Sequence, residues 1–121
     1  MGDRILVVED DDTVRRLIRM LLEDESFEVV EAATGQDAVD LFDQSIDLVL
    51  LDVRLPEMNG LDLSRAIKGD DRFKTKPIII LTTESSEELK MKGKEIGVTG
   101  WMVKPFNDEK LVKSIKMVLG V

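Results

Sequence analysis

Apolar residues gather in short runs that recur along the chain and alternate with stretches of helical spacing. The runs at 5–8, 48–51 and 78–81 are continuously apolar, which is typical of strands covered on both faces of a sheet. The run at 28–32 carries charges at both ends, so we expect it at a sheet edge. A shorter run at 101–103 completes the set of predicted strands.

The stretches between these runs predict amphipathic helices, because their apolar residues recur every three or four positions. Asp12 or Thr13 is expected to cap the first helix. The fourth helix has only a weak apolar stripe and is unusually polar. The residues that mark the five helices in turn are Val14, Leu17, Ile18, Leu21 and Leu22; Ala38, Leu41 and Phe42; Leu63 and Ile67; Leu89, Gly93 and Ile96; and Leu111, Val112, Ile115, Val118 and Leu119.

Strands that alternate with helices from one end to the other predict an α/β fold. The expected architecture is a five-stranded parallel sheet with right-handed crossovers and helices on both faces, a three-layer sandwich. A chain of 121 residues has the size of one compact domain, and we expect residues 1–121 to form it.

Composition narrows the location and the partners. No apolar run approaches the roughly 20 residues of a membrane span, and the N-terminus lacks a signal-peptide layout, so we expect a cytoplasmic protein without membrane contact. The net charge of −8 argues against binding nucleic acid by the chain itself, which requires a basic surface.

Two residue types are missing from the chain. Without Cys there are no disulfides, thiol nucleophiles or thiolate metal sites. Without His there is no imidazole base and no His-ligated zinc. Any chemistry therefore depends on carboxylates, hydroxyls, Lys, Arg and the backbone.

Polar side chains follow four of the five predicted strands. Taken singly, such a residue is more often a helix cap or a solvated side chain than part of a site. Because ligands of an open parallel sheet bind beyond the carboxyl ends of its strands, the joint placement predicts one shared site. Its candidate members are Glu9 and Asp10 after the first strand, Asp52 after the third, Thr82 and Thr83 at the fourth, and Lys104 after the fifth.

Crowded carboxylates call for a cation, a proton or a nearby Lys. Two unit charges about 4 Å apart repel by roughly 4 kcal/mol at an effective dielectric constant of 20. Carboxylate and carbonyl oxygens suit Mg²⁺, which favours phosphate oxygens. A carboxylate nucleophile, Mg²⁺, a hydroxyl and an ammonium group are together suited to moving a phosphoryl group onto Asp52.

Four segments together give the chain a clear family resemblance. It resembles the receiver domain of two-component response regulators, especially the single-domain CheY-type members. The resemblance covers essentially the whole chain and implies a flavodoxin-like (βα)5 fold with strand order 2-1-3-4-5. The segments are Val8-Glu9-Asp10-Asp11, Leu51-Asp52 with Leu55-Pro56-Glu57-Met58-Asn59-Gly60, Leu81-Thr82-Thr83-Glu84, and Gly100-Trp101-Met102-Val103-Lys104-Pro105-Phe106.

The resemblance implies that the chain is a signalling switch rather than a turnover enzyme. Asp52 would accept its phosphoryl group from a phospho-His on a sensor histidine kinase or phosphotransfer protein. Asp10 and Asp52 would bind Mg²⁺ with the backbone carbonyl of Arg54, and Glu9 would help through water. Lys104 would form an ion pair with the phosphoryl group.

The resemblance also implies how the switch works. Thr82 would hydrogen-bond the phosphoryl group and move toward it, and Trp101 would turn inward. This would remodel the surface of the fourth helix, fifth strand and fifth helix, where a downstream protein target binds. The Lys104-Pro105 peptide bond is expected to be cis.

Some positions depart from the commonest family pattern or tune it. The acidic pair begins with Glu9 rather than Asp, and Trp101 is larger than the usual Tyr or Phe. Thr83 stands where the family usually has Ala or Gly, and we expect its bulk to narrow access to the phosphoryl group. The positions of Arg54 and Glu84 tune the lifetime of the phosphorylated state in the family.

Several alternatives differ in class. A haloacid dehalogenase-type phosphatase needs a second Asp two residues after the first, where this chain has Arg54. A flavin module needs a phosphate-cradling loop after the first strand, where this chain is acidic. The others are a receiver-fold binding module that works without phosphorylation, and a receiver taken from a longer regulator or hybrid kinase. For a protein that stands alone, the resemblance suggests chemotaxis.

Overall fold

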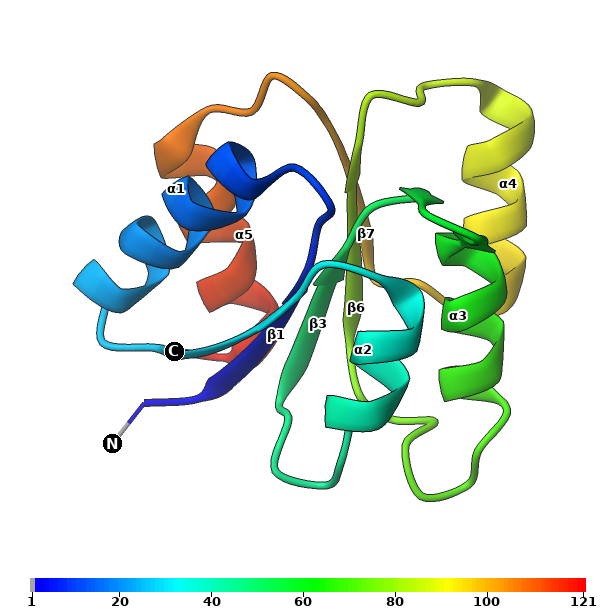
Figure 1. The fold of residues 1–121 in the computed structure, drawn as a ribbon, viewed down its shortest axis with the longest axis horizontal. Helices are drawn as coiled ribbons and strands as arrows, with labels where there is room; N and C mark the ends of the chain where they lie inside the picture. Colours follow the sequence, from blue (N-terminus) through cyan, green and yellow to red (C-terminus); the bar gives the residue numbers. More distant parts are fainter. Residues whose placement is uncertain (1) are drawn as a thin grey trace.

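The protein folds around a five-stranded parallel sheet. The computed structural model describes residues 2–121, and its strand order is β2-β1-β3-β6-β7 (Figure 1). Counted along the chain within this sheet, that is the predicted order 2-1-3-4-5, with β2 at one edge as expected. The strands are β1 (Arg4–Val8), β2 (Glu28–Ala32), β3 (Leu48–Leu51), β6 (Ile78–Thr82) and β7 (Gly100–Val103).

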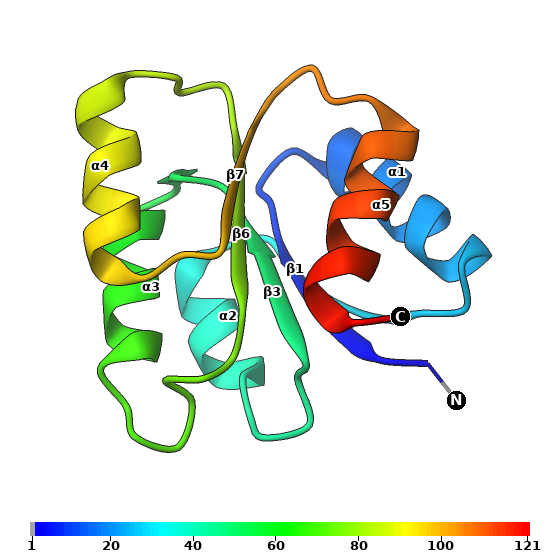
Figure 2. The same ribbon diagram turned by 180° about the vertical axis from the view of Figure 1, so that it is seen from behind.

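Helices cover both faces of the sheet, which confirms the three-layer prediction. One layer holds α1 (Asp12–Asp24) and α5 (Asp108–Leu119), which lie side by side in both ribbon views (Figures 1 and 2). The opposite layer holds α2 (Gly35–Leu41), α3 (Gly60–Lys68) and α4 (Glu87–Ile96). The sheet therefore separates two hydrophobic cores.

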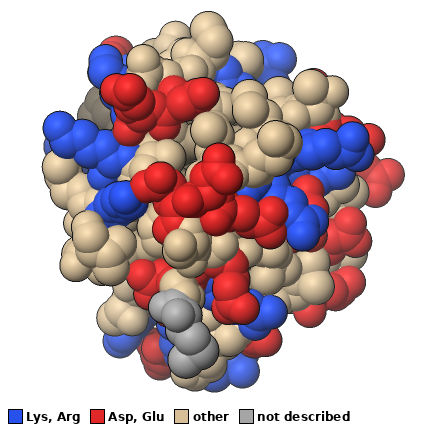
Figure 3. Space-filling model, turned by 90° about the vertical axis from the view of Figure 1, so that its left-hand side faces the viewer, with Lys and Arg blue, Asp and Glu red and all other residues tan. Residues whose placement is uncertain are grey.

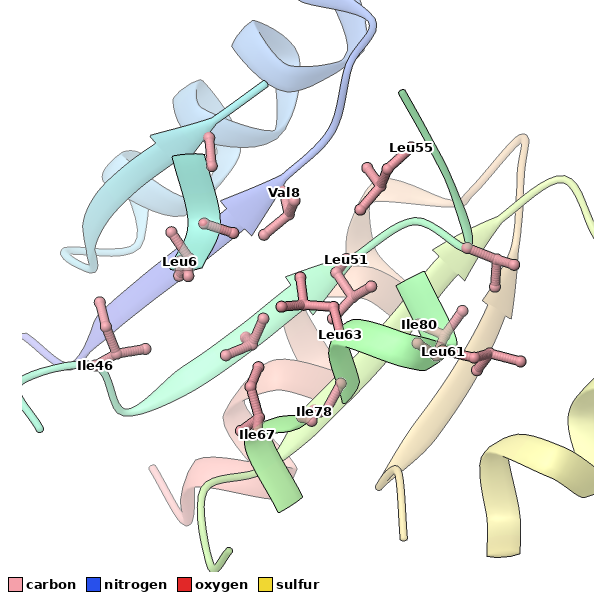
Figure 4. Packing of buried hydrophobic residues seen from close by; sticks show 14 of the residues in the cluster. Leu6, Val8, Ile46, Leu51, Leu55, Leu61, Leu63, Ile67, Ile78 and Ile80 are labelled. Atoms are coloured by element: carbon pink, nitrogen blue, oxygen red, sulfur yellow. The ribbon is translucent and has the colours of Figure 1, made fainter. Parts of the chain in front are cut away.

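The central strands supply side chains to both cores. Along β1, Ile5 and Val7 pack toward α1 and α5, whereas Leu6 and Val8 pack toward α2 and α3 (Figure 4). All four side chains are at most 1% exposed. A strand buried on both faces has no reason to alternate in polarity, so the continuous apolar runs predicted this arrangement correctly.

The first helix is capped one residue earlier than predicted. We expected Asp12 or Thr13 as the cap, but the cap is Asp11. Its Oδ1 accepts hydrogen bonds from the backbone N–H groups of Thr13 (2.9 Å) and Val14 (3.0 Å). The carboxylate of Asp11 thus satisfies backbone donors that a helix start leaves free.

A small antiparallel hairpin follows β3 and was not predicted. It pairs β4 (Arg54–Leu55) with β5 (Met58–Asn59), directly before α3. Two-residue strands are too short to show a hydrophobic period, so the sequence pattern could not reveal them. The side chain of Asn59 caps α3 by accepting a hydrogen bond from the Leu61 N–H at 2.7 Å.

Within residues 2–121, none of the helices combines the length and the apolar character needed to cross a membrane.

Candidate functional site

The register of the sheet brings the predicted site residues to one edge. Val8 of β1 pairs with Leu51 of β3, so Glu9 and Asp52 leave neighbouring strands at the same level. Thr82 and Val103 pair in the same way, so Lys104 emerges just beyond the end of β6. The carboxyl edge of the sheet therefore holds acidic, hydroxyl and basic groups together.

Asp52 lies at the centre of this site. Its residue is 6% exposed, and its two oxygens have different partners. Oδ1 accepts a hydrogen bond from the Arg54 N–H at 3.0 Å, and Oδ2 lies 2.7 Å from Nζ of Lys104. These contacts hold the carboxylate in one orientation at a nearly buried position.

Gly60 packs directly against the backbone of Asp52. A Cβ atom at Gly60 would lie 2.0 Å from the Asp52 carbonyl oxygen, a distance that no side chain can occupy. The Gly60 N–H also donates to the carbonyl of Val53 at 2.7 Å. Gly60 is part of one of the four segments that carry the family resemblance, but its close packing against Asp52 was not predicted. That packing depends on how closely the β4–β5 hairpin approaches the end of β3.

Lys104 spans the distance from β7 to the acidic residues. Its N–H donates to the Thr82 carbonyl at 2.8 Å, which ties its backbone to the end of β6. Its ammonium group forms ion pairs with both Asp52 and Glu9. Burial by itself would lower the pKa of Lys104, but the hydrogen bonds to Asp52 and Glu9 outweigh it and raise the pKa. The expected cis peptide bond between Lys104 and Pro105 is present.

Glu9 uses its longer arm to reach Lys104. One carboxylate oxygen pairs with the ammonium group, and Oε2 accepts a hydrogen bond from the Asp11 N–H at 3.0 Å. The residue is 3% exposed, and this burial raises the pKa of Glu9 against the lowering effect of Lys104. An extra cation near Glu9 would favour the ionised form.

The acidic residues form a group suited to a metal ion. Glu9, Asp10 and Asp52 can each place a carboxylate oxygen within 4.8 Å of the others. Asp10 is exposed, while the other two are buried. Hard oxygen donors of this kind, with one side open to water, fit Mg²⁺. Asp11, committed to capping α1, is not needed for the group.

Glu84 links the hydroxyl side of the site to Trp101. Thr82 is fully buried. Among residues 2–121, its Oγ1 has one hydrogen bond, a long one of 3.4 Å that it accepts from the Glu84 N–H. The Glu84 carbonyl accepts a hydrogen bond of 2.9 Å from Nε1 of Trp101. This backbone link was not predicted, because carbonyl acceptors leave no mark in a sequence.

Trp101 packs half-buried against α4. Its ring lies beside Gly93, where an added Cβ would approach the ring to 3.0 Å. Leu89 and Ile96 complete the apolar contacts on the same side of the sheet. The weak apolar stripe of α4 thus packs against a large aromatic residue of β7.

Arg54 and Glu84 form an ion pair across the loops that follow β3 and β6. The Arg54 side chain is 74% exposed, which places the pair at the surface. Thr83, between Thr82 and Glu84, is exposed. We expected these three residues to modulate the site, and that role stays a prediction.

Acidic side chains also gather on the face that α1 covers. Figure 3 shows red side chains across the middle of this face, with blue ones toward its sides. The exposed acidic residues at the C-terminal end of α1 include Glu23, Asp24 and Glu25. This face offers no continuous basic surface of the kind that a nucleic-acid backbone requires.

Known proteins share both the sequence and the fold of this chain. Residues 5–116 match the response regulator receiver domain family. The transcriptional regulatory protein CpxR of Escherichia coli K12 is 42% identical over 117 residues, which are 97% of this chain and 49% of CpxR. SrrA of Staphylococcus aureus NCTC 8325 is 39% identical over 120 residues, 98% of this chain and 48% of SrrA. The chain thus spans about half the length of these curated relatives.

Solved structures agree with this assignment. The chemotaxis response regulator CheY4 of Vibrio cholerae superposes with a TM-score of 0.89 at 37% identity, covering 98% of this chain and 99% of that one. The non-phosphorylated HemR receiver domain of Leptospira biflexa gives 0.93 at 31% identity, covering 99% and 96%. Receiver domains of response regulators are signalling switches, not turnover enzymes. The chain belongs to the response regulator receiver domain family.

Proposed function

We propose that Asp52 accepts a phosphoryl group from a phospho-His on a sensor histidine kinase or phosphotransfer protein. The observation that carries this proposal is the ammonium group of Lys104 lying 2.7 Å from Oδ2 of Asp52, beside the acidic group. An ammonium group at this position can pair with the carboxylate before the reaction and with the oxygens of an incoming phosphoryl group during it.

In this proposal a carboxylate oxygen of Asp52 attacks phosphorus while the P–N bond of the donor breaks. The histidine leaves with the bonding electrons, and an acyl phosphate remains on Asp52. Lys104 exchanges its contacts with Asp52 and Glu9 for contacts with phosphoryl oxygens. Asp10, Asp52 and the Arg54 carbonyl would hold Mg²⁺, with Glu9 acting through water. Bound Mg²⁺ supplies neutralisation of the phosphoryl oxygens.

The same proposal assigns the switch to Thr82 and Trp101. Among the described residues, the Thr82 hydroxyl has one hydrogen bond, a long one, to give up. Turning toward a phosphoryl group would therefore cost the hydroxyl little free energy. Its movement would shift Glu84, whose carbonyl holds the indole of Trp101. An inward turn of Trp101 would then alter the α4–β7–α5 surface, where we place the downstream protein target.

The switch could be a single-domain protein or one domain of a longer regulator. We propose residues 1–121 as a single receiver domain in the cytoplasm, and CheY4, of matching length, supports a chemotaxis role. The transcriptional regulators CpxR and SrrA support instead a receiver within a longer regulator, in which the rest of the protein would bind DNA. The size of the natural gene product, measured by immunoblot with an antibody against this domain, distinguishes the two.

One experiment tests phosphoryl transfer itself. The protein is incubated with Mg²⁺ and acetyl phosphate, and its intact mass is measured. We expect the mass of one added phosphoryl group, which is lost in Asp52→Ala and in excess EDTA. No gain under any condition would favour a binding module that works without phosphorylation. Beryllofluoride, a phosphoryl mimic, should change the fluorescence of Trp101, the single Trp.

A further inference from the structure

The guanidinium group of Arg15 connects three parts of the molecule beside the acidic group. Its NH1 donates to the Glu9 carbonyl at 2.7 Å. Its NH2 donates to Asp12 at 2.6 Å, and its Nε lies 3.3 Å from a carboxylate oxygen of Glu31 on β2. The side chain is only 16% exposed, so Arg15 is held in place rather than solvated.

The contact with Glu9 bears on the peptide that leads into the site. The Glu9 N–H donates to the Ala32 carbonyl at 3.0 Å, and its carbonyl accepts from Arg15, so both backbone groups of Glu9 are bonded. The carbonyl belongs to the peptide plane shared with Asp10. In residues 2–121 the Asp10 carboxylate has no hydrogen-bond or ion-pair partner, so its backbone is what limits the positions that the carboxylate can reach.

The charges around Arg15 indicate that its main effect is to orient the Glu9–Asp10 peptide rather than to neutralise the acidic group. Asp12 and Glu31 already offset its single positive charge. If Arg15 is removed, Glu31 keeps its ion pair with Arg19 at 2.6 Å, and Asp12 is 79% exposed and solvated. In the part of the chain that the structure describes, Arg15 is the one hydrogen-bond donor to the Glu9 carbonyl.

We infer that Arg15 is a positioning residue for the metal-binding group: it fixes the Glu9–Asp10 peptide so that Asp10 and Glu9 present their oxygens together. This inference rests on the proposed Mg²⁺-dependent function of Asp52. Outer contacts that orient metal ligands typically change metal affinity 10–100-fold when removed.

Arg19 provides a matched control. It lies one helical turn further along α1 and pairs with the same Glu31 and with Glu23. Among the residues that the structure describes, it makes no hydrogen bond to the Glu9 carbonyl, which Arg15 does. Arg15→Gln and Arg19→Gln therefore remove the same charge from the same network, and only the first removes the bond to Glu9.

The test begins without metal. Amide hydrogen exchange of Glu9 and Asp11 is measured by NMR in EDTA, and we expect faster exchange in Arg15→Gln but not in Arg19→Gln. Mg²⁺ alone is then titrated by calorimetry. We expect the Kd of Arg15→Gln to rise by about tenfold, and that of Arg19→Gln to stay within about twofold of the unaltered protein. At saturating Mg²⁺, Arg15→Gln should regain the unaltered rate of Asp52 phosphorylation by acetyl phosphate.

Arg15→Lys separates orientation from charge, and also serves if Arg15→Gln folds poorly. An ammonium group keeps the charge but not the planar fork, so the Kd should stay raised; full rescue would overturn the positioning role. Equal Kd values for the Arg15 and Arg19 variants would overturn it as well, while phosphorylation of the unaltered protein leaves the proposed function intact. If the unaltered protein neither binds Mg²⁺ nor gains a phosphoryl group, both fail.

Discussion

Nζ of Lys104 lies 2.7 Å from Oδ2 of Asp52, although β6 separates the strands that these two residues follow. The same ammonium group pairs with Glu9, so one cation holds two buried carboxylates. The contact makes Lys104 the counter-ion of both carboxylates. In the proposed function, the same ammonium group would pair with the phosphoryl group.

Lys104→Met should destabilise the metal-free protein. It leaves the Glu9 and Asp52 side chains, 4% and 8% exposed, without their cation. Breaking a buried pair in this way costs about 3 kcal/mol. Urea unfolding in EDTA measures the loss, and adding Asp52→Asn should recover much of it. A single variant as stable as the unaltered protein would show that water already screens the two carboxylates.

Gly60→Ala should damage both the fold and the site. The new Cβ would meet the Asp52 carbonyl oxygen, a backbone atom that cannot rotate away. We expect a loss of about 2 kcal/mol from overpacking and slower phosphorylation of Asp52. Thermal unfolding and the acetyl phosphate mass assay measure these effects. Gly69→Ala, at the far end of α3, is the milder control: its Cβ would meet the Arg65 carbonyl oxygen at 3.1 Å rather than 2.0 Å, so we expect a smaller loss of stability and an unchanged rate of Asp52 phosphorylation.

Gly93→Val should disturb Trp101 through direct contact. Even a Cβ at this position approaches the Trp101 ring to 3.0 Å and Val98 to 3.1 Å. We expect a loss of about 2 kcal/mol and a shift of the indole emission as the ring is displaced. Met91→Val places the same residue at a 61% exposed position of the same helix and should show neither effect. Matching spectra for the two variants would contradict the packing described here.

Thr83→Ala should accelerate both phosphorylation and dephosphorylation of Asp52 severalfold. Thr83 is exposed between Thr82 and Glu84, and we propose that its bulk restricts the approach to the phosphoryl group. Time courses of intact mass with acetyl phosphate, and after its removal, give both rates. Thr83→Val keeps the bulk and should keep the slow rates. If Val also accelerates the reactions, the hydroxyl group rather than the size is responsible.

Arg54→Ala should shorten the lifetime of the phosphorylated state with little effect on stability. The Arg54–Glu84 pair lies across the loops beside Asp52, and its loss would open a path for water. Exposed pairs contribute at most about 1 kcal/mol to folding. Glu84→Gln should shorten the lifetime similarly, and the double variant should add little more. Additive effects of the two changes would mean that the residues act separately.

Local patterns were enough to predict the sheet, its helices and the polar residues at its carboxyl edge. A continuous apolar run indicates a strand that is buried on both faces, and helical spacing of apolar residues indicates a helix that is buried on one face. Both patterns can be recognised in a single sequence. The strand order came from the family resemblance. The structure agrees with it and brings Glu9, Asp52 and Lys104 together.

Contacts for which several residues could serve as the partner could be identified only from the tertiary structure. Several carboxylates could cap α1, and only the path of the loop selects Asp11 over Asp12. The close return of Gly60 to Asp52 and the carbonyl acceptors of Trp101 and Arg15 have no local signature, because every residue carries the same carbonyl group. Sequence periodicity specified most of the buried residues and which strand ends are polar, although Leu17 and Leu41 of the predicted apolar stripes are exposed. Three-dimensional packing decided which atoms those side chains reach.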